Sequence, residues 1–454
     1  MVSECQRVAN GLPIFEAAET GHATHMYGPL TNVIVGGVFR LAGPSLYPGR
    51  LLSVASLALG LILLIRLTRP KGQWLGAFMV VAMFVAFGQA ANWYVEIRPD
   101  CTSAFAALVA VWMMFESHRR DSLKWLFAAS VACVVALLFR QPAAMVTGIP
   151  ACAMLVSREK FTQPRRLAFC LLPLGICLAV LGLIRTQFPQ VFHYLVAVPS
   201  TYPISIPECF GWFLWFAVVT TGFWLALFWT RHLRQNGPLT FESKSAWLIA
   251  AVLVTLPCCV VTAAKEGGTS NSLLPALFAV AGLFLHWSEP LQRWLKESVE
   301  TKDTATSRTS GPKSRFASGT ILATCVLLPM FVISVHSPQG TFGDRGFEAI
   351  QKFADENPSA TFASPYDPAL VVLARGNPGR SIMLEYDAAG WPTDVPRWFF
   401  SDLDAADYAV TVAGWRAWPL AAESVEDMMQ QRGFHRVMLP TLADSAYRLW
   451  SRAD

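Results

Sequence analysis

Long apolar runs with few charged residues set the first limit on how this chain can fold. Hydrophobic residues make up 54% of its 454 residues and charged residues only 15%, whereas soluble globular proteins carry about 25% charged residues. A bilayer core requires about 20 apolar residues per helix, and ten runs approach that length. They cover residues 47–66, 74–90, 101–116, 124–139, 142–156, 166–185, 210–231, 245–264, 273–287 and 318–336. We therefore expect a mostly α, polytopic membrane protein with about ten spans.

An eleventh apolar segment, residues 28–42, is short and carries Arg40. These properties predict a re-entrant or interfacial helix rather than a span. The transmembrane body is accordingly expected to cover residues 28–339.

The charge balance changes near Gly340. Residues 1–339 contain 26 Lys and Arg against 15 Asp and Glu, and residues 340–454 contain 10 against 16. The acidic segment has no long apolar run and no cysteine. Helical and strand patterns alternate along it, which predicts a small soluble α/β domain over residues 340–454. Helices are expected at 344–357, 365–376 and 422–433, and strands at 360–364, 408–413, 436–440 and 447–451.

The basic residues of the loops indicate the orientation. Under one alternating path, 19 Lys and Arg fall on one side and 7 on the other, and we assign the richer side to the cytoplasm. Residues 1–30 then form an external loop, and the domain at 340–454 lies outside the cytoplasm. The loop follows neither a signal peptide nor a span. We expect that a helix preceding Glu4 is missing, as a misassigned start codon would cause; translocation of a short tail is the alternative.

Charged residues gather on the outer side at IRPD, residues 97–100. Asp100 stands at the start of a predicted helix, where an aspartate can simply cap the helix. Its position beside Arg98 at the bilayer boundary also suits a functional acid. Both interpretations are open.

Two further outer segments suit an anionic ligand. In KEGGTSNSLLP, residues 265–275, Lys265 offers a point charge, the glycines let the backbone approach a ligand, and Asn271 precedes a helix. Arg140, in LLFRQPA, could hold the same anion or extend to the interface. An ordinary connecting loop is the alternative for 265–275.

Histidines occur in two other outer loops. His22 and His25 follow Glu4 in residues 1–30, but H-x-x-H without a second ligand pair is a weak metal signal, and a solvated loop is the simpler interpretation. His193 lies in the aromatic, proline-rich stretch 188–205, which could anchor at the headgroups or line a groove for a lipid chain.

Several motif-based functions find no support in the sequence. It contains no GxxxxGK[ST] phosphate loop, no HExxH, no GxSxG and no CxxC pair, and no dinucleotide fingerprint follows a strand. No long basic stripe indicates nucleic-acid binding.

Five segments in one order carry a family resemblance. The chain resembles bacterial membrane glycosyltransferases of the GT-C fold, the polyprenyl-phosphate-sugar-dependent type related to protein mannosyltransferases and lipid A aminoarabinose transferases. The segments are ECQRVANGLPIF (4–15), YGPLTNVIVGGVFRLAGPSLYPGRLLS (27–53), IRPDCTSAF (97–105), LLFRQPA (137–143) and KEGGTSNSLLPAL (265–277).

The resemblance implies roles for particular residues. An acid in the first external loop acts as general base, a second acid assists it, and basic residues hold the donor phosphate. Carried over, Glu4 and Asp100 are the catalytic acids and Lys265 and Arg140 the phosphate ligands. Arg98, Asn271 and His193 complete the expected binding residues. No metal ligand is assigned and no cofactor is certain, although a divalent cation is compatible with the site.

The expected activity is transfer of a sugar, with inversion, from a polyprenyl-phosphate carrier to a lipid, glycan or protein on the external face of a bacterial inner membrane. Membrane lipids are the other expected partners, nucleic acid is not, and the sequence does not indicate the oligomeric state. The alternatives are a lipid-linked-sugar flippase or multispan transporter, or an inactive truncated homologue. Transporters usually carry internal repeats, and none is visible here.

Overall fold

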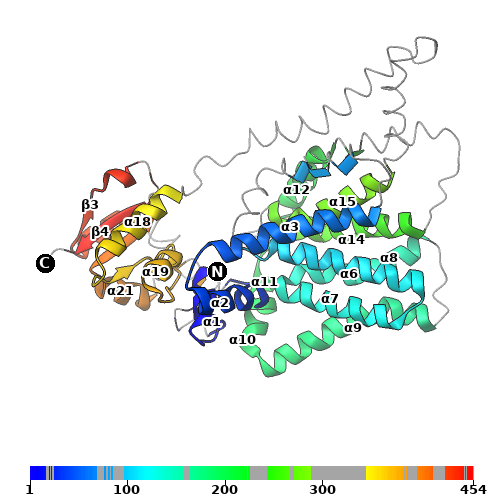
Figure 1. Cartoon of the computed structure of the whole chain (residues 1–454), viewed down its shortest axis with the longest axis horizontal. Helices are drawn as coiled ribbons and strands as arrows, with labels where there is room; N and C mark the ends of the chain where they lie inside the picture. Colours follow the sequence, from blue (N-terminus) through cyan, green and yellow to red (C-terminus); the bar gives the residue numbers. More distant parts are fainter. Residues whose placement is uncertain are drawn as a thin grey trace, which may run out of the picture. The chain divides into compact units, whose positions relative to one another are not determined.

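The chain folds into two compact units (Figure 1). Unit 1 consists of Met1–Gly49, Ile184–Thr201 and Pro338–Asp454, and unit 2 of Arg50–Leu183 and Tyr202–Ser337. The structure is a computed structural model. It describes residues 1–16, 20, 22, 25–68, 76–77, 80–81, 83–84, 97–157, 164–221, 223–224, 243–265, 270–287, 344–382, 384–385, 396–412, 425–443, 445 and 447–452.

Helices make up the described part of unit 2, and they follow the predicted apolar runs. Within that part, three segments are long and apolar enough to cross a membrane: Tyr47–Thr68, Arg165–Gln187 and Lys244–Ala263. Most of the predicted run 74–90 and all of 318–336 lie outside the described residues, so the total of ten spans stays a prediction. The helices are α3 (Tyr47–Thr68), α6 (Asp100–Arg120), α7 (Leu123–Phe139), η2 (Gln141–Gly148), α8 (Ile149–Val156), α9 (Pro164–Gln187), α12 (Ile206–Val219), α14 (Ser243–Ala263), η4 (Ser270–Leu273) and α15 (Leu274–Trp287).

A tight hairpin joins α6 to α7 and positions the polar residues discussed below. Asp121 ends α6 in the left-handed conformation with φ 47°, and the amide of Ser122 donates to the carbonyl oxygen of Ser117 at 3.1 Å. This pairing satisfies a carbonyl group at the helix end, as helix C-terminal motifs do. Helix α7 runs antiparallel to α6, and the two helices pack along their length (Figure 1). The end of α7 therefore lies beside the beginning of α6.

Apolar side chains also cover the outside of the helices in unit 2. On α9, Leu171 and Leu178 are 52% and 57% exposed, and on α3 Leu59 and Ile62 are each 50% exposed. Exposed leucine and isoleucine along whole helices suit lipid as the surrounding solvent. The protein is thus an apolar-surfaced helical membrane protein, as the composition predicts.

Unit 1 contains a four-stranded sheet with strand order β1-β2-β4-β3. Strand β1 (Phe362–Ala363) pairs in parallel with β2 (Tyr408–Val412), while β4 (Tyr447–Arg452) pairs antiparallel with β2 and with β3 (Phe434–Val437). A parallel pair requires a crossover connection, which here includes α19 (Pro368–Arg375) and α21 (Arg397–Asp404). Helices α18 (Asp344–Glu356) and α22 (Val425–Gln431) pack on β4 and β3, respectively. The described residues between 344 and 452 thus contain the predicted combination of helices and strands, while the predicted domain bounds stay a prediction.

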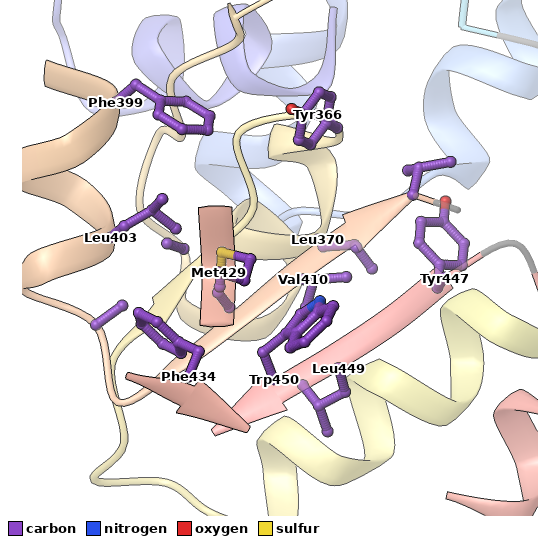
Figure 2. Packing of buried hydrophobic residues seen from close by; sticks show 14 of the residues in the cluster. Tyr366, Leu370, Phe399, Leu403, Val410, Met429, Phe434, Tyr447, Leu449 and Trp450 are labelled. Carbon is purple, nitrogen blue, oxygen red and sulfur yellow. The ribbon is translucent and has the colours of Figure 1, made fainter. Parts of the chain in front are cut away.

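The core of this α/β region lies between the sheet and its helices (Figure 2). Four consecutive residues of β2 are buried, from Ala409 to Val412, so side chains are covered on both faces of the strand. Trp450 is fully buried, and its indole N–H donates to Thr411 Oγ1 at 2.8 Å. Such a bond satisfies the polar edge of a large buried ring. The packed core fixes the loops at the sheet edge, which form part of a cavity discussed below.

The remaining parts of unit 1 are short helices: α1 (Val2–Ala9), α2 (Leu30–Ala42), α10 (Pro189–Phe192), η3 (His193–Ala197) and α11 (Val198–Thr201). Helix α2 occupies the segment predicted to be interfacial or re-entrant. Helix α1 corrects the expectation of a solvated loop over residues 1–30, because residues 2–7 are buried. It packs against α2 and α19.

The contact between α1 and α2 depends on Gly36. A Cβ atom at this position would lie 2.6 Å from the carbonyl oxygen of Cys5 and 2.6 Å from Val8 Cβ, whereas a Cβ atom at Gly37 would meet nothing within 4 Å. We expect Gly36→Ala to displace α1 and to speed maleimide labelling of the buried Cys5 about tenfold, because overpacking costs about 1–3 kcal/mol. Mass spectrometry of the Cys5 peptide measures the rate.

Gly37→Ala is the matched control, since it places the same methyl group on the same helix in open space. Its Cys5 labelling rate should equal that of the unmodified protein. Equal rates in both variants would show that the close approach at Gly36 does not hold α1.

Candidate functional site

A buried charged cluster in unit 2 centres on Asp100, the first residue of α6. Its side chain is 1% exposed, and Oδ1 forms an ion pair with Arg140 Nη1. No other hydrogen bond to its carboxylate occurs among the described residues, and Oδ2 is buried without a partner there. The carboxylate therefore does not cap the helix, although capping was one of the two interpretations of this residue. It is held by a basic side chain from the next helix.

Arg140 lies where α7 ends and η2 begins. Its amide still donates to the carbonyl oxygen of Ala136 at 3.0 Å, but its backbone is extended, with φ −156° and ψ 125°. Pro142 follows closely and disfavours a continued α-helix. This break turns the side chain toward Asp100, while Nη2 donates to Ser272 Oγ at 3.0 Å. The guanidinium is 14% exposed and thus nearly buried.

The segment between α14 and α15 supplies the polar wall of this cluster. Ser270, Asn271 and Ser272 form η4 and are 1%, 3% and 5% exposed. Ser272 accepts from Arg140, and Ser270 Oγ has no hydrogen-bond partner among the described residues. A buried hydroxyl group without a hydrogen-bond partner costs free energy, so Ser270 suits contact with a ligand.

Lys265 lies just after the end of α14, and Arg98 lies just before the start of α6. Lys265 forms an isolated antiparallel bridge with Ile204, and the amide of Ser205 donates to the carbonyl oxygen of Ala264 at 3.2 Å. The carbonyl oxygen of Arg98 accepts from Ser53 Oγ at 3.3 Å. Residues 266–269, which include the two glycines considered for anion binding, lie outside the described residues.

The charges of the cluster are balanced, but its hydrogen bonds are not. Arg140 neutralises Asp100, and a buried carboxylate oxygen without a partner costs about 1–3 kcal/mol. Together with the unpaired hydroxyl of Ser270, it gives the cluster one strong acceptor and one weak donor for a ligand. The open carboxylate oxygen of Asp100 suits a donor such as a ligand hydroxyl group.

Unit 1 holds a second cluster around Glu4 on α1. The Glu4 side chain is 4% exposed, and its Oε1 lies 2.6 Å from His25 Nδ1 and accepts from the His25 amide at 3.3 Å. The ammonium of Met1 lies 2.7 Å from Oε2. Burial favours the protonated acid, but this ammonium and His25 outweigh it and hold the pKa of Glu4 well below its usual range. Glu4 is thus an ionised carboxylate in a buried setting.

Helix α1 is bound to the α/β region of the same unit. Ser3 Oγ donates to the carbonyl oxygen of Gly379 at 2.7 Å, and Gln6 Nε2 donates to that of Gly376 at 2.9 Å. Arg7, beyond Gln6, pairs with Glu16 and donates through Nε to the carbonyl oxygen of Pro13 at 2.8 Å. These bonds fix the helix that carries Glu4.

The structure distributes the predicted site residues over both units. Asp100 and Arg140 are paired, and Asn271 lies next to Ser272, the partner of Arg140, all within unit 2. Glu4 and His193 belong to unit 1, where His193 begins η3 and its ring contacts Tyr194 edge-on at 5.3 Å. Sequence reasoning missed Ser270, Ser272 and the role of His25. The polar triplet SNS directly before the apolar run at 273–287 was the available signal for the serines.

No set of three His, Cys, Asp or Glu residues suited to a metal ion occurs in the described part of the chain. His25 pairs with Glu4, while His22 lies at a different place, the cavity described below. The two histidines of the H-x-x-H spacing therefore serve separate surroundings.

Comparison with known proteins identifies the class of fold. Residues 26–184 match the sequence profile of the family described as dolichyl-phosphate-mannose-protein mannosyltransferase. The structure of ArnT from Cupriavidus metallidurans in the apo state matches with a TM-score of 0.55 and 15% identity, over 100% of this chain and 92% of that chain. ArnT bound to undecaprenyl phosphate matches with a TM-score of 0.54 and 14% identity, over 100% and 93%.

The chain therefore has the GT-C fold of membrane glycosyltransferases, as its sequence resemblance indicates. The apo oligosaccharyltransferase of Archaeoglobus fulgidus also aligns, at 13% identity and a TM-score of 0.48, over 100% of this chain and 70% of that chain. A search of curated protein sequences gives no match.

Proposed function

We propose that the protein transfers a sugar from a polyprenyl-phosphate carrier to an acceptor on the external face of a bacterial inner membrane. The observation that carries this proposal is the buried Asp100–Arg140 pair with its unpartnered carboxylate oxygen, placed in a GT-C fold. The matched ArnT structure holds undecaprenyl phosphate, a carrier of this chemical type. A buried ion pair with an open acceptor suits a ligand better than it suits stability.

The leaving group determines what the protein must supply. In a polyprenyl-phosphate sugar, the bond that breaks joins the anomeric carbon to a phosphate oxygen, and the phosphate departs as a stabilised anion. A cation near that oxygen stabilises the charge that develops. Arg140 takes this role in our proposal, with Lys265, Arg98 and Asn271 binding the remainder of the phosphate and sugar.

The acceptor must lose a proton as its oxygen or nitrogen attacks the anomeric carbon. In our proposal Glu4 receives that proton as the general base, the role that the family resemblance gives to an acid of the first external loop. Asp100 would orient the acceptor or the donor sugar through Oδ2, and His193 would line the approach of the lipid. One displacement inverts the anomeric centre and needs no covalent intermediate. This division of roles extends the family resemblance to these residues.

Asp100→Asn tests the carrying observation. We expect sugar transfer to fall about 100-fold, because a preorganised charged partner of the reacting groups is worth about 10²–10³-fold in rate. The assay follows radiolabelled sugar from a polyprenyl-phosphate donor into the acceptors of membranes from the source cell, made in a strain that lacks the endogenous gene.

Asp121→Asn is the matched control at the opposite end of α6. Asp121 is 75% exposed and pairs only with the equally exposed Arg165 among the described residues, so its loss should leave transfer unchanged. Full transfer by Asp100→Asn would refute the proposed site. Movement of the intact lipid-linked sugar across vesicles without transfer would instead indicate a flippase.

A further inference from the structure

A cavity of about 460 Å³ lies in unit 1 beside β1, the edge strand of the sheet. Residues 361–365, which include β1, line the cavity together with residues of α21 and the segment 378–380. His22 from the N-terminal part of the unit also lines it. The volume falls in the range of small-molecule sites, about 300–1,000 Å³. None of the residues proposed above for sugar transfer lines this cavity.

Ser364 points to a ligand for the cavity. The residue is 5% exposed, it lines the cavity, and its Oγ has no hydrogen-bond partner among the described residues. A buried hydroxyl without a partner loses the hydrogen bonds that water would give it. A ligand hydroxyl in the cavity would restore one of them.

The charged residues of the cavity cancel each other. Arg380 Nη1 lies 3.5 Å from Asp402 Oδ1, and the guanidinium stands over the Trp398 ring, 5.7 Å from its centroid. Burial and the charges of Arg7 and Arg380 lower the pKa of His22, against an opposite effect of Glu16, so its ring is neutral at neutral pH. The cavity thus offers donors and acceptors without a net charge.

The apolar part of the wall completes the pattern. Phe399, which is fully buried, lines the cavity together with Pro365 and Val371, and Figure 2 shows Phe399 at the α21 side of the core. A sugar ring presents hydroxyl groups at its edge and C–H groups on its faces. The hydroxyl groups match the carboxylate, guanidinium and serine, and the C–H faces match the apolar wall.

We propose that this cavity binds a neutral sugar ring. The cavity is also connected to the helix that carries Glu4. The carbonyl oxygen of Gly379, which lines the cavity, accepts a hydrogen bond from Ser3, the residue before Glu4. A sugar in the cavity therefore lies against the segment that holds the helix of the general base. The role of the cavity as a substrate subsite rests on the proposed function, whereas sugar binding itself does not.

Direct binding to the full chain in lipid nanodiscs tests this proposal. The probes are methyl α-D-glucopyranoside, methyl α-D-galactopyranoside, methyl α-D-mannopyranoside and N-acetylglucosamine, followed by saturation-transfer difference NMR. We expect at least one to bind, and Ser364→Val or Asp402→Asn to weaken its binding about tenfold, the loss typical of one hydrogen bond to a buried or charged group.

Asp404→Asn is the matched control on α21. Asp404 lies outside the cavity lining and pairs with Arg432 at 2.8 Å, so sugar binding should be unchanged. The proposal is overturned if none of the four probes binds, or if the affinity is the same in Ser364→Val, Asp402→Asn and the unmodified protein. Binding of inorganic phosphate that is lost in Arg380→Gln, in place of sugar binding, overturns it as well.

A competition experiment distinguishes a sugar of the donor from a sugar of the acceptor. Displacement of the free sugar by a short-chain polyprenyl-phosphate mannose or glucose, but not by the bare polyprenyl phosphate, assigns the cavity to the donor. If the free sugar stays bound in the presence of the lipid-linked sugar, the cavity is assigned to the acceptor. Glu4→Gln should keep full sugar binding, so that failure of this site and failure of the proposed transfer are read out separately.

Discussion

Sugar transfer is expected to fall about 10³-fold when Glu4 is replaced by glutamine, because a positioned general base contributes about 10²–10⁴-fold. Glutamine keeps the shape of the side chain but cannot accept the proton of the acceptor. It can still accept a hydrogen bond from the His25 amide, which lies 3.3 Å from Oε1. Because the variant also breaks the ion pairs of Glu4, the loss is measured as the rate of transfer per amount of folded protein.

The assay is the same radiolabel transfer, run at saturating donor, with folded protein measured by size-exclusion chromatography. Glu348→Gln, on the exposed face of α18 in the same unit, is the control for a neutralised glutamate and should transfer normally. A Glu4→Gln variant with more than about a tenth of normal transfer would remove Glu4 from the role of general base.

Replacing Arg140 by methionine should have a double effect, on folding and on transfer. It leaves the Asp100 carboxylate buried without its cation, which costs about 3–5 kcal/mol in a broken buried pair. It also removes the proposed stabilisation of the leaving phosphate, worth about 10²–10³-fold in rate. We expect a large drop in the thermal transition of the protein in nanodiscs and almost no transfer.

The double variant Arg140→Met with Asp100→Asn separates the two effects. Both charges are then gone, so much of the lost stability should return, while transfer stays absent. Recovery of transfer along with stability would mean that the pair acts only in folding. Arg165→Met, which removes an arginine that is 75% exposed, controls for the loss of a guanidinium and should change neither quantity.

The fold could be predicted from the sequence where one physical period dominates. Uninterrupted apolar runs indicated the helices of unit 2, and alternating patterns placed α18, α19, α22 and the four strands of the α/β region within a few residues, whereas α21 was not predicted. Helix α1 escaped prediction because only eight residues form it, and four of them, Ser3, Glu4, Gln6 and Arg7, are polar. Its helical form depends on burial against α2 and α19, which no local pattern encodes.

The partner of Asp100 illustrates the limit for the site. The neighbour in sequence, Arg98, was the expected companion, yet Arg140 forms the ion pair. The hairpin of α6 and α7 brings together the start of one helix and the end of the next, and two consecutive apolar runs with a short connection do indicate such a hairpin. The contribution of Ser272, 132 residues further along the chain from Arg140, depends on tertiary packing that no spacing rule gives.

The bonds from α1 to Gly376 and Gly379 also bear on the order in which the protein is made. Ser3 leaves the ribosome long before its partner, which is 376 residues away in the sequence. Chains generally fold from the N-terminus as they are synthesised, but unit 1 gathers its first, middle and last segments into one body. The helix that carries Glu4 can thus reach its final contacts only after the segment around Gly376 and Gly379 has been synthesised. Placement of the proposed general base therefore depends on one of the last parts of the chain to be made.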